Sequence, residues 1–184
     1  MLVTFQPLSR LAPPEFLVFS QMNPDLICEL NANGSITLRR EEYQPSAKKL
    51  RLSLFLALAQ WNKESSAGFV PDRNTYFVFK SGAVRQPAIT WLKNYKKEIA
   101  IQNIVQNILE TAPDFVAEFL TAHDNLEETK RKMREYITNG TALAWLMDAD
   151  CEKIYIFRAG GFETQIGLHE KSMGEEVMRG FTFG

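Results

Sequence analysis

The segment Pro113–Leu120 reads Pro-Asp-Phe-Val-Ala-Glu-Phe-Leu, and its last six residues constrain the fold more than any other stretch. Apolar, strand-compatible residues surround one acid, Glu118, with no turn residue among them, so the pattern predicts a buried β-strand. An ionised carboxylate in such a strand is unfavourable unless a metal, a cation or hydrogen bonds compensate it. Glu118 is therefore a candidate for chemistry. The alternatives are a salt-bridged core glutamate and an edge strand with one wet face.

The segment that follows predicts a crossover unit. Asp124 is expected to cap a helix over residues 125–139, which Gly140 ends. Residues 141–147 are a nearly continuous apolar run, which is typical of a strand in the centre of a sheet. A helix between two such strands fits a right-handed βαβ crossover, so the Glu118 strand and residues 141–147 are predicted to be parallel.

Helices and strands alternate along the rest of the chain. We expect an irregular arm over 1–13, a helix over 15–21, a strand over 26–30, its hairpin partner over 35–39, a helix over about 47–64 capped by Ser46, strands over 75–79 and 83–92, a helix over 93–111, and strands over 153–157 and 162–166. This order predicts a single α/β (α+β) domain over 1–184, with helices flanking a central mixed β-sheet. Glu29 repeats the pattern of Glu118, because it is a lone acid within an apolar strand.

Composition narrows the class of protein. The chain has 184 residues, 45% of them hydrophobic and 23% charged, which is typical of a folded domain. The formal net charge of −1 does not imply a nucleic-acid partner, so such a partner would need a local basic patch. Cys28 and Cys151 are each in or beside an apolar strand and are predicted to be buried thiols rather than a disulfide. His123 and His169 are isolated, which argues against a structural zinc site.

The N-terminus lacks the features of a signal peptide, and the apolar stretch over 50–61 is too short and too interrupted to span a bilayer. We therefore expect a cytoplasmic protein with no membrane partner. One basic cluster lies around the start of the predicted second helix; it consists of Arg39, Arg40, Lys48, Lys49 and Arg51. It is a candidate nucleic-acid-binding patch, although basic runs at the start of a helix are more often a solvated face.

Several short segments, in order and spacing, resemble one known family. They are 23–30 (Asn-Pro-Asp to Glu-Leu), a hairpin at Gly34, 82–85 (Gly-Ala-Val-Arg), 113–118 (Pro-Asp-Phe-Val-Ala-Glu), 132–136 (Lys-Met-Arg-Glu-Tyr) with Gly140, 145–148 (Trp-Leu-Met-Asp) and Gly180-Phe181. Together they resemble the Uma-two family, which is assigned to restriction endonucleases within the PD-(D/E)XK nuclease superfamily. The resemblance covers about residues 15–183.

The resemblance implies a restriction-endonuclease-like core and a site in which carboxylates hold Mg²⁺ or Mn²⁺ beside a lysine. Such a cation would polarise a phosphate and activate a water molecule. Glu29 and Glu118 match the family's acids and are the expected metal ligands. The superfamily's usual lysine position is Leu120 in this chain, and Lys132 on the following helix matches best, with Lys130 second. A lysine there would stabilise the charge on the phosphate.

One position departs from the family pattern. The family's Arg-x-Pro-Asp segment is Arg85-Gln86-Pro87-Ala88 here, so Ala88 replaces the central metal-binding Asp. Gln86 and Thr90 have the same strand parity and would offer only neutral oxygens. Asp114 is a further auxiliary candidate, but it lies about 13 Å from Glu118 along an extended strand and is better explained as a turn residue.

Besides a purely structural or protein-interaction domain that binds no nucleic acid, two functions therefore remain open. The first is a Mg²⁺-dependent endonuclease acting on DNA, with Glu29, Glu118 and Lys132 as its catalytic residues. The second is a nuclease fold that has lost catalysis and serves as a nucleic-acid-binding or protein-interaction module. A homodimer is expected, because nucleases that cut both strands of a palindrome commonly work as two-fold dimers. No nucleotide cofactor is expected.

Overall fold

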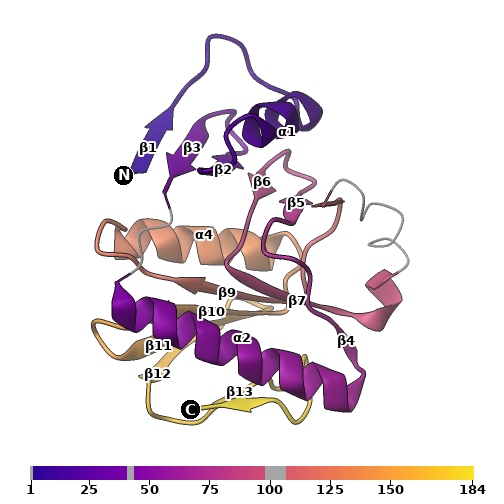
Figure 1. Ribbon diagram of the computed structural model, residues 1–184, viewed down its shortest axis with the longest axis vertical. Helices are drawn as coiled ribbons and strands as arrows, with labels where there is room; N and C mark the ends of the chain where they lie inside the picture. Colours follow the sequence, from indigo (N-terminus) through magenta and orange to yellow (C-terminus); the bar gives the residue numbers. More distant parts are fainter. Residues whose placement is uncertain (1, 41–43, 98–106) are drawn as a thin grey trace.

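The structure is a computed structural model that describes residues 2–40, 44–97 and 107–184. These residues form two six-stranded sheets and one two-stranded ribbon (Figure 1). The N-terminal sheet has the strand order β1 (Leu2–Phe5), β3 (Ile36–Arg39), β2 (Ile27–Leu30), β6 (Val84–Arg85), β5 (Tyr76–Val78) and β8 (Ile108–Leu109). The C-terminal sheet has the order β12 (Glu163–Gly167), β11 (Lys153–Arg158), β10 (Leu143–Asp148), β9 (Phe115–Phe119), β7 (Ile89–Lys93) and β4 (Gly68–Phe69). The ribbon pairs β13 (Ser172–Met173) with β14 (Thr182–Phe183).

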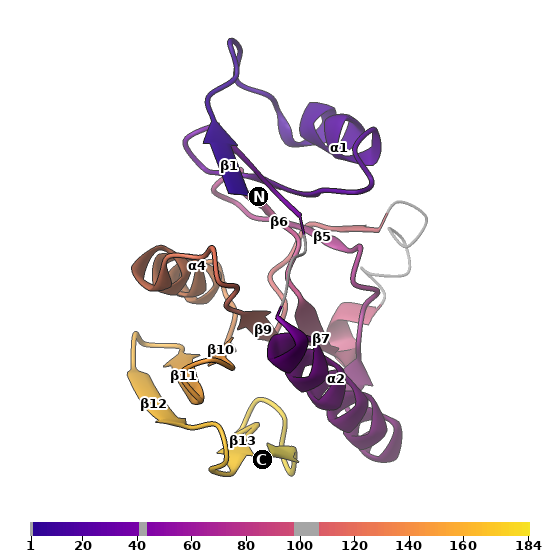
Figure 2. The same ribbon diagram turned by 60° about the vertical axis from the view of Figure 1, so that its left-hand side comes forward.

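Three α-helices of the described residues cover these sheets. Helix α1 (Pro13–Gln21) packs on the N-terminal sheet, where Phe16 and Leu17 join a core cluster with Cys28 and Leu30. Helix α4 (Leu126–Thr138) and helix α2 (Pro45–Ser65) lie on opposite faces of the C-terminal sheet (Figures 1 and 2). The predicted mixed sheet flanked by helices is thus confirmed, whereas the separate N-terminal sheet was not anticipated.

Alternation along β9 explains why the C-terminal sheet has two apolar faces. Phe115, Ala117 and Phe119 pack in the cluster that contains α2 residues, and Val116 packs in the cluster that contains α4 residues. Because successive side chains of a strand point to opposite faces, Glu118 shares the α4 face with Val116. Strands β9 and β10 pair in parallel, as the crossover pattern predicted, with Leu146 opposite Glu118.

The chain crosses from one sheet to the other at Pro87. The sequence predicts one strand over 83–92, but the structure has β6 in the N-terminal sheet and β7 in the C-terminal sheet. Proline has no N–H for a sheet hydrogen bond, which favours a break at this point. The two acid-bearing strands lie beside this crossing, since β2 pairs with β6 and β9 pairs with β7.

Four local predictions were wrong. Residues 2–5 of the expected irregular arm form β1, which pairs with β3. The N-cap of α2 is Gln44 rather than Ser46, because Pro45 takes the first helical position, where its missing N–H does no harm. Asn125 rather than Asp124 caps α4 and accepts the amide N–H of Glu128. Cys28 is buried, as predicted, but Cys151 is exposed because it lies in the turn after β10.

The helix predicted over 93–111 is also wrong at both ends. Lys93 ends β7, a 3₁₀ turn follows over Asn94–Lys96, and Ile108–Leu109 form β8. The middle of that prediction, with its apolar stripe at Ile101, Ile104 and Val105, lies outside the described residues.

Candidate functional site

Strand alternation aims both predicted acids at α4. Cys28 and Leu30 of β2 pack against α1, so Glu29 between them points to the other side of the N-terminal sheet. Glu118 points from the C-terminal sheet to the same region. Both side chains are almost fully buried, with 5% of Glu29 and 2% of Glu118 exposed.

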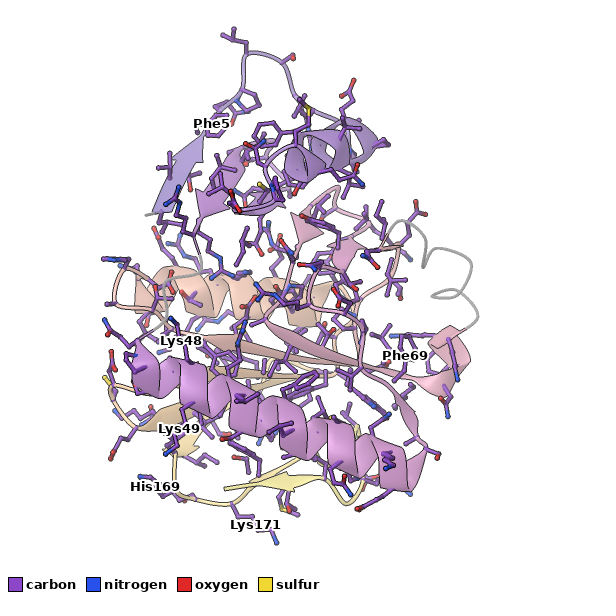
Figure 3. All side chains as sticks on the ribbon, viewed as in Figure 1. Phe5, Lys48, Lys49, Phe69, His169 and Lys171 are labelled. Atoms are coloured by element: carbon purple, nitrogen blue, oxygen red, sulfur yellow. The ribbon has the colours of Figure 1, made fainter. Side chains whose placement is uncertain are left out.

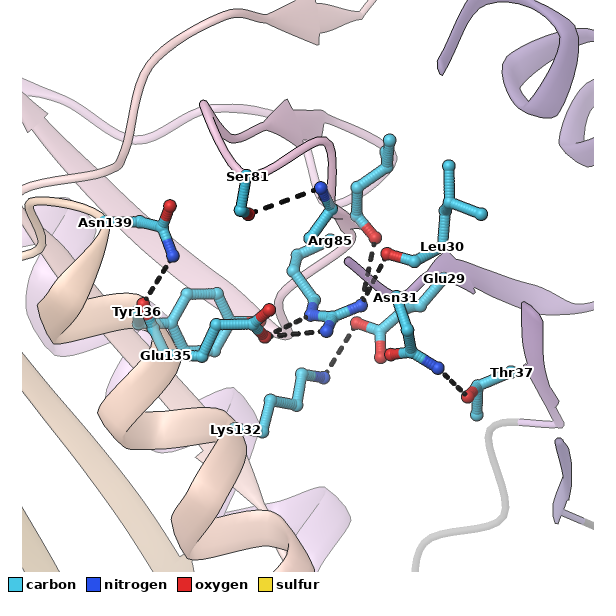
Figure 4. A network of polar contacts seen from close by, with 12 residues as sticks. Glu29, Leu30, Asn31, Thr37, Ser81, Arg85, Lys132, Glu135, Tyr136 and Asn139 are labelled. Carbon is cyan, nitrogen blue, oxygen red and sulfur yellow. Dashed lines mark hydrogen bonds and ion pairs between the residues drawn. The ribbon is translucent and has the colours of Figure 1, made fainter. Parts of the chain in front are cut away.

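Lys132 of α4 lies between the two acids. Its Nζ atom is 2.7 Å from Oε1 of Glu29 and 2.8 Å from Oε1 of Glu118. Figure 4 shows the contact with Glu29, in which the lysine reaches from α4 toward β2. The structure therefore brings together the three residues that the sequence proposed as catalytic, and one ammonium group bridges both carboxylates.

A second ion pair joins the same elements. Arg85 donates from Nε and Nη2 to Oε2 of Glu135, at 2.8 and 2.6 Å, and from Nη1 to the carbonyl of Leu30 at 2.9 Å (Figure 4). Since Glu135 lies one helical turn after Lys132, the same face of α4 carries both contacts. Arg85 thus connects β6, β2 and α4.

Glu118 has two further partners. The hydroxyl of Tyr136 donates to its Oε1 at 2.8 Å, and Arg39 Nη2 is 3.7 Å from its Oε2. The fully buried Tyr136 stays protonated, because burial and the negative charge of Glu118 raise its pKa well above the ordinary value. Among the described residues, the cluster holds three carboxylates (Glu29, Glu118, Glu135) and three cations (Arg39, Arg85, Lys132).

The charges around Glu29 control its protonation. Burial alone would raise the pKa of its carboxyl, but Lys132, Arg85 and Arg39 outweigh burial and lower the pKa to about 2. Burial alone would also lower the pKa of Arg85, but Glu29 and Glu135 raise it instead. Glu29 is therefore an anion and Arg85 a cation throughout the physiological pH range.

The cluster opens into a cavity of about 700 Å³ between the N-terminal sheet and α4. Side chains of β1, β2 and β3 line one wall, and the first half of α4 lines the other. Glu29, Glu118, Arg39 and Lys132 all border this space. The ionic cluster therefore lies at the wall of a space that a ligand can enter.

The donors present do not fit a divalent cation as the residues are arranged. Mg²⁺ prefers several oxygen ligands, usually one or two carboxylates with water and phosphate oxygens. Here Lys132 takes the position between the two carboxylates, and Arg39 is a second cation beside Glu118. Within residues 2–40, 44–97 and 107–184, no three His, Cys, Asp or Glu side chains gather as a metal site would require.

Ala88 borders a different, small space of about 10 Å³, which it shares with Gln86 and with Arg39, a residue that also lines the large cavity. Extending the β7–β9 register by one residue would place Ala88 opposite Glu118, but β7 begins only at Ile89. Gln86 contributes its backbone N–H, which donates to Glu29 Oε1 at 3.3 Å. Thr90 lies opposite Val116 in the sheet.

The other auxiliary candidates lie outside the site. Asp114 accepts the backbone N–H of Lys93 at 2.9 Å and pairs with Lys96 Nζ at 3.1 Å, so it stabilises the turn before β9. Lys130 pairs with Glu127 at 3.2 Å and lies over the ring of Tyr155. Lys132 is therefore the lysine that the fold places between the acids.

The predicted basic cluster is divided. Arg39 is in the ionic site, whereas Lys48 and Lys49 are exposed near the start of α2 (Figure 3). Arg51 borders the small space beside Ala88, and Arg40 borders an open cavity that adjoins this space. Lys48 and Lys49 line neither of these two spaces, so only three of the five predicted residues come together.

The fold and the carboxylate–lysine site define the class of protein, which is a nuclease-like α+β domain. The crystal structure of a "putative nuclease belonging to DUF820" from Anabaena variabilis has the same fold. The superposition of the two chains has a TM-score of 0.70 at 14% sequence identity. It covers 82% of this chain and 83% of the Anabaena variabilis chain. The comparison with curated proteins gives no match.

A family model narrows this class. The model of the Uma-two family, described as "putative restriction endonuclease", matches residues 13–183. The chain therefore belongs to the Uma-two family, as the sequence segments indicated.

Sequence reasoning missed three members of the site and misplaced a fourth. Arg85, Glu135 and Tyr136 were part of the family resemblance but had no role assigned to them, and Arg39 was assigned to a surface patch. The spacing of Glu135 and Tyr136, three and four residues after Lys132, would have placed them on the lysine's face of a helix. Nothing local predicts the contact between Arg85 and Glu135, which lie 50 residues apart.

Proposed function

We propose that this chain is a DNA-binding member of its nuclease family whose carboxylate site has low affinity for divalent cations and hydrolyses phosphodiester bonds poorly. One observation carries the proposal: Lys132 Nζ bridges Glu29 and Glu118 at 2.7 and 2.8 Å. A divalent cation would have to displace this internal cation. Ala88 supplies no oxygen that would favour the displacement.

The residues of the cavity suit the binding of a phosphate group. Arg39 and Lys132 border the open space, and both present N–H donors of the kind that bind phosphate oxygens. Lys132 can exchange one carboxylate contact for a phosphate contact, because its ammonium has three donors. In this role Glu29 and Glu118 position the lysine, and no bond of the DNA needs to break.

The test is plasmid nicking by the wild-type protein and by Ala88→Asp, with Mg²⁺ or Mn²⁺. We expect little nicking by the wild type. Ala88→Asp should bind Mg²⁺ more tightly by calorimetry and should nick measurably, because the β7–β9 register, continued by one residue, places the added carboxylate opposite Glu118. Glu118→Ala in the Ala88→Asp background is the control and should abolish the gain.

A second candidate is an active metal-dependent endonuclease. It is favoured by the convergence of Glu29, Glu118 and Lys132, from three different elements, at one open cavity. Efficient wild-type nicking that disappears in Glu118→Ala would establish this candidate and refute the first.

A protein-interaction module would behave differently from both. A DNA-binding protein should be retained on immobilised DNA at low salt and should be released steeply as salt rises. Absence of retention at low salt would refute the DNA-binding part of the proposal.

A further inference from the structure

A second group of charged side chains lies on the other side of Arg39 from the carboxylates. The small space of about 10 Å³ beside Ala88 is bordered by three arginines: Arg39, Arg51 and Arg73. Arg73 and Gln86 also border an open cavity of about 460 Å³, to which Arg40 contributes. We call these two adjoining spaces, with Arg39, Arg40, Arg51, Arg73 and Gln86, the arginine groove.

The arginine groove and the carboxylate cavity differ in charge. Of the described residues, the carboxylate cavity has five acids and four bases; the acids are Glu29, Glu118, Asp124, Glu128 and Glu135, and the bases are Arg39, Arg85, Arg131 and Lys132. The groove has four arginines and one acid, Asp25, among the described residues that border it. A polyanion is therefore attracted more strongly to the groove than to the carboxylates beside it.

The four arginines of the groove belong to separate segments of the chain. Arg39 ends β3 and Arg40 follows it, Arg51 belongs to α2, and Arg73 lies in the loop between β4 and β5. Each guanidinium has five N–H donors, so a contact that it already makes leaves others for a ligand. Guanidinium groups held on different elements can contact one anion from several sides. A flexible run of lysines in one segment approaches an anion from one side only.

Gln86 provides an independent sign that the groove is polar and hydrated. Its side chain is 8% exposed, and its Oε1 is buried without a hydrogen-bond partner among the described residues. A space of about 10 Å³ is close to the minimum that holds one water molecule. A water molecule there would satisfy Gln86 and bridge it to a ligand, as is common in protein–DNA interfaces.

We propose that the arginine groove binds a backbone phosphate of a nucleic acid, with Arg40 and Arg73 at its open side and Arg51 deeper. This inference rests on the DNA binding proposed above and names the surface that provides it. Arg39 borders both the groove and the carboxylate cavity. A nucleic-acid strand bound in the groove therefore places its neighbouring phosphate near Lys132. This explains how the carboxylate cavity, which has more acids than bases, can bind an anion.

The test is fluorescence anisotropy of a short labelled DNA duplex with the wild-type protein, Arg40→Ala, Arg73→Ala and the double variant. Neither residue belongs to the carboxylate site, and both are exposed, so the fold should survive; circular dichroism and thermal melting check this. Lys171→Ala removes one positive charge from an exposed position next to β13 and is the matched control.

We expect each arginine variant to weaken binding roughly five- to tenfold at low salt, uniformly across DNA sequences. The slope of log K against log salt should fall by about one for each arginine removed. Lys171→Ala should bind as the wild type does.

Wild-type affinity and slope in both arginine variants would overturn the groove while leaving the proposed DNA binding intact. No binding by the wild-type protein would overturn both. An equal loss in Lys171→Ala would show that net charge alone controls the affinity, and would also overturn the groove.

Discussion

Glu29 shows how one buried side chain depends on its neighbours. An ionised carboxylate that is 5% exposed is tolerated because Lys132, Arg85 and Arg39 surround it and Gln86 donates a backbone N–H. Replacement of either partner of such a pair leaves the other charge buried without compensation. Protonation of Glu29 removes its charge in the same way, so the free energy of unfolding should depend on pH.

The free energy of unfolding should fall steeply as the pH drops through the range in which Glu29 titrates. Its carboxyl has a pKa of about 2 in the folded protein and about 4.5 as a model compound, so the unfolded chain binds the proton first. The stabilisation is complete above about pH 4.5 and is lost as the pH falls toward 2; it amounts to about 3 kcal/mol. Denaturant unfolding across this range measures it.

Glu29→Gln should lack this part of the pH dependence, although it is less stable than the wild type at pH 7. The exposed Glu64→Gln should keep the wild-type dependence and serves as the control. Parallel curves for the wild type and Glu29→Gln would contradict the assignment.

At the scale of the element, α4 organises the site. Asn125 caps its start, Lys132 and Tyr136 contact the acids, and Glu135 pairs with Arg85. These three contacting residues lie at helical spacings of three and four, so one face of α4 meets both sheets. Lys130 is only two residues away and therefore points elsewhere.

Lys132→Met should destabilise the protein by about 3–5 kcal/mol, because Glu29 and Glu118 lose their shared cation. Lys130→Met should cost about 1 kcal/mol or less, since its partner Glu127 is largely exposed. Thermal melting of the two variants measures the difference.

The same pair of variants tests whether Lys132 excludes a divalent cation. Millimolar Mg²⁺ should raise the melting temperature of Lys132→Met, whose two carboxylates then face one empty position, and should leave the wild type and Lys130→Met unchanged. A comparable Mg²⁺ shift in the wild type would show that the cation and the lysine coexist.

At the scale of the whole molecule, the ionic cluster lies between two sheets that also share an apolar cluster, in which Phe77 of β5 and Leu109 of β8 pack with Val116 of β9. Strands β2 and β3 of the N-terminal sheet pack with α1, and the C-terminal sheet packs with α2 and α4. The crossing at Pro87 and the contacts of Arg85, Arg39 and Glu29 to α4 and β9 join the two parts. Within the described residues, no helix is both long and apolar enough to cross a bilayer.

Arg85→Met should loosen the N-terminal sheet selectively. The substitution leaves Glu135 without its bidentate partner and the carbonyl of Leu30 without its Arg85 donor, at a cost of about 2–4 kcal/mol. Hydrogen exchange should accelerate in β2 and β3 more than in β9 and β10. Uniform acceleration in both sheets would show that the two parts unfold as one cooperative unit.

The sequence alone determined the elements whose patterns are local. The apolar run around Glu118, the crossover helix and residues 141–147 predict two parallel strands, because burial on both faces requires continuous apolar residues. The same alternation picked out Glu29 and Glu118 as acids in buried strands. The order of the short segments also indicated the family, since spacing along the chain reflects the order of elements in the fold.

Tertiary structure decided which residues meet. The split of the strands at Pro87 into two sheets depends on pairing with β2 and β9, and the short strand β8 replaces the expected end of a helix because it pairs with β5. No local sequence pattern predicts the contact of Arg85 with Glu135. Nor does one predict the separation of Arg39 from Lys48 and Lys49. Lys132 matched the family position, but only the fold places its ammonium between two carboxylates from different sheets, since an ion pair depends on three-dimensional distance and not on position along the chain.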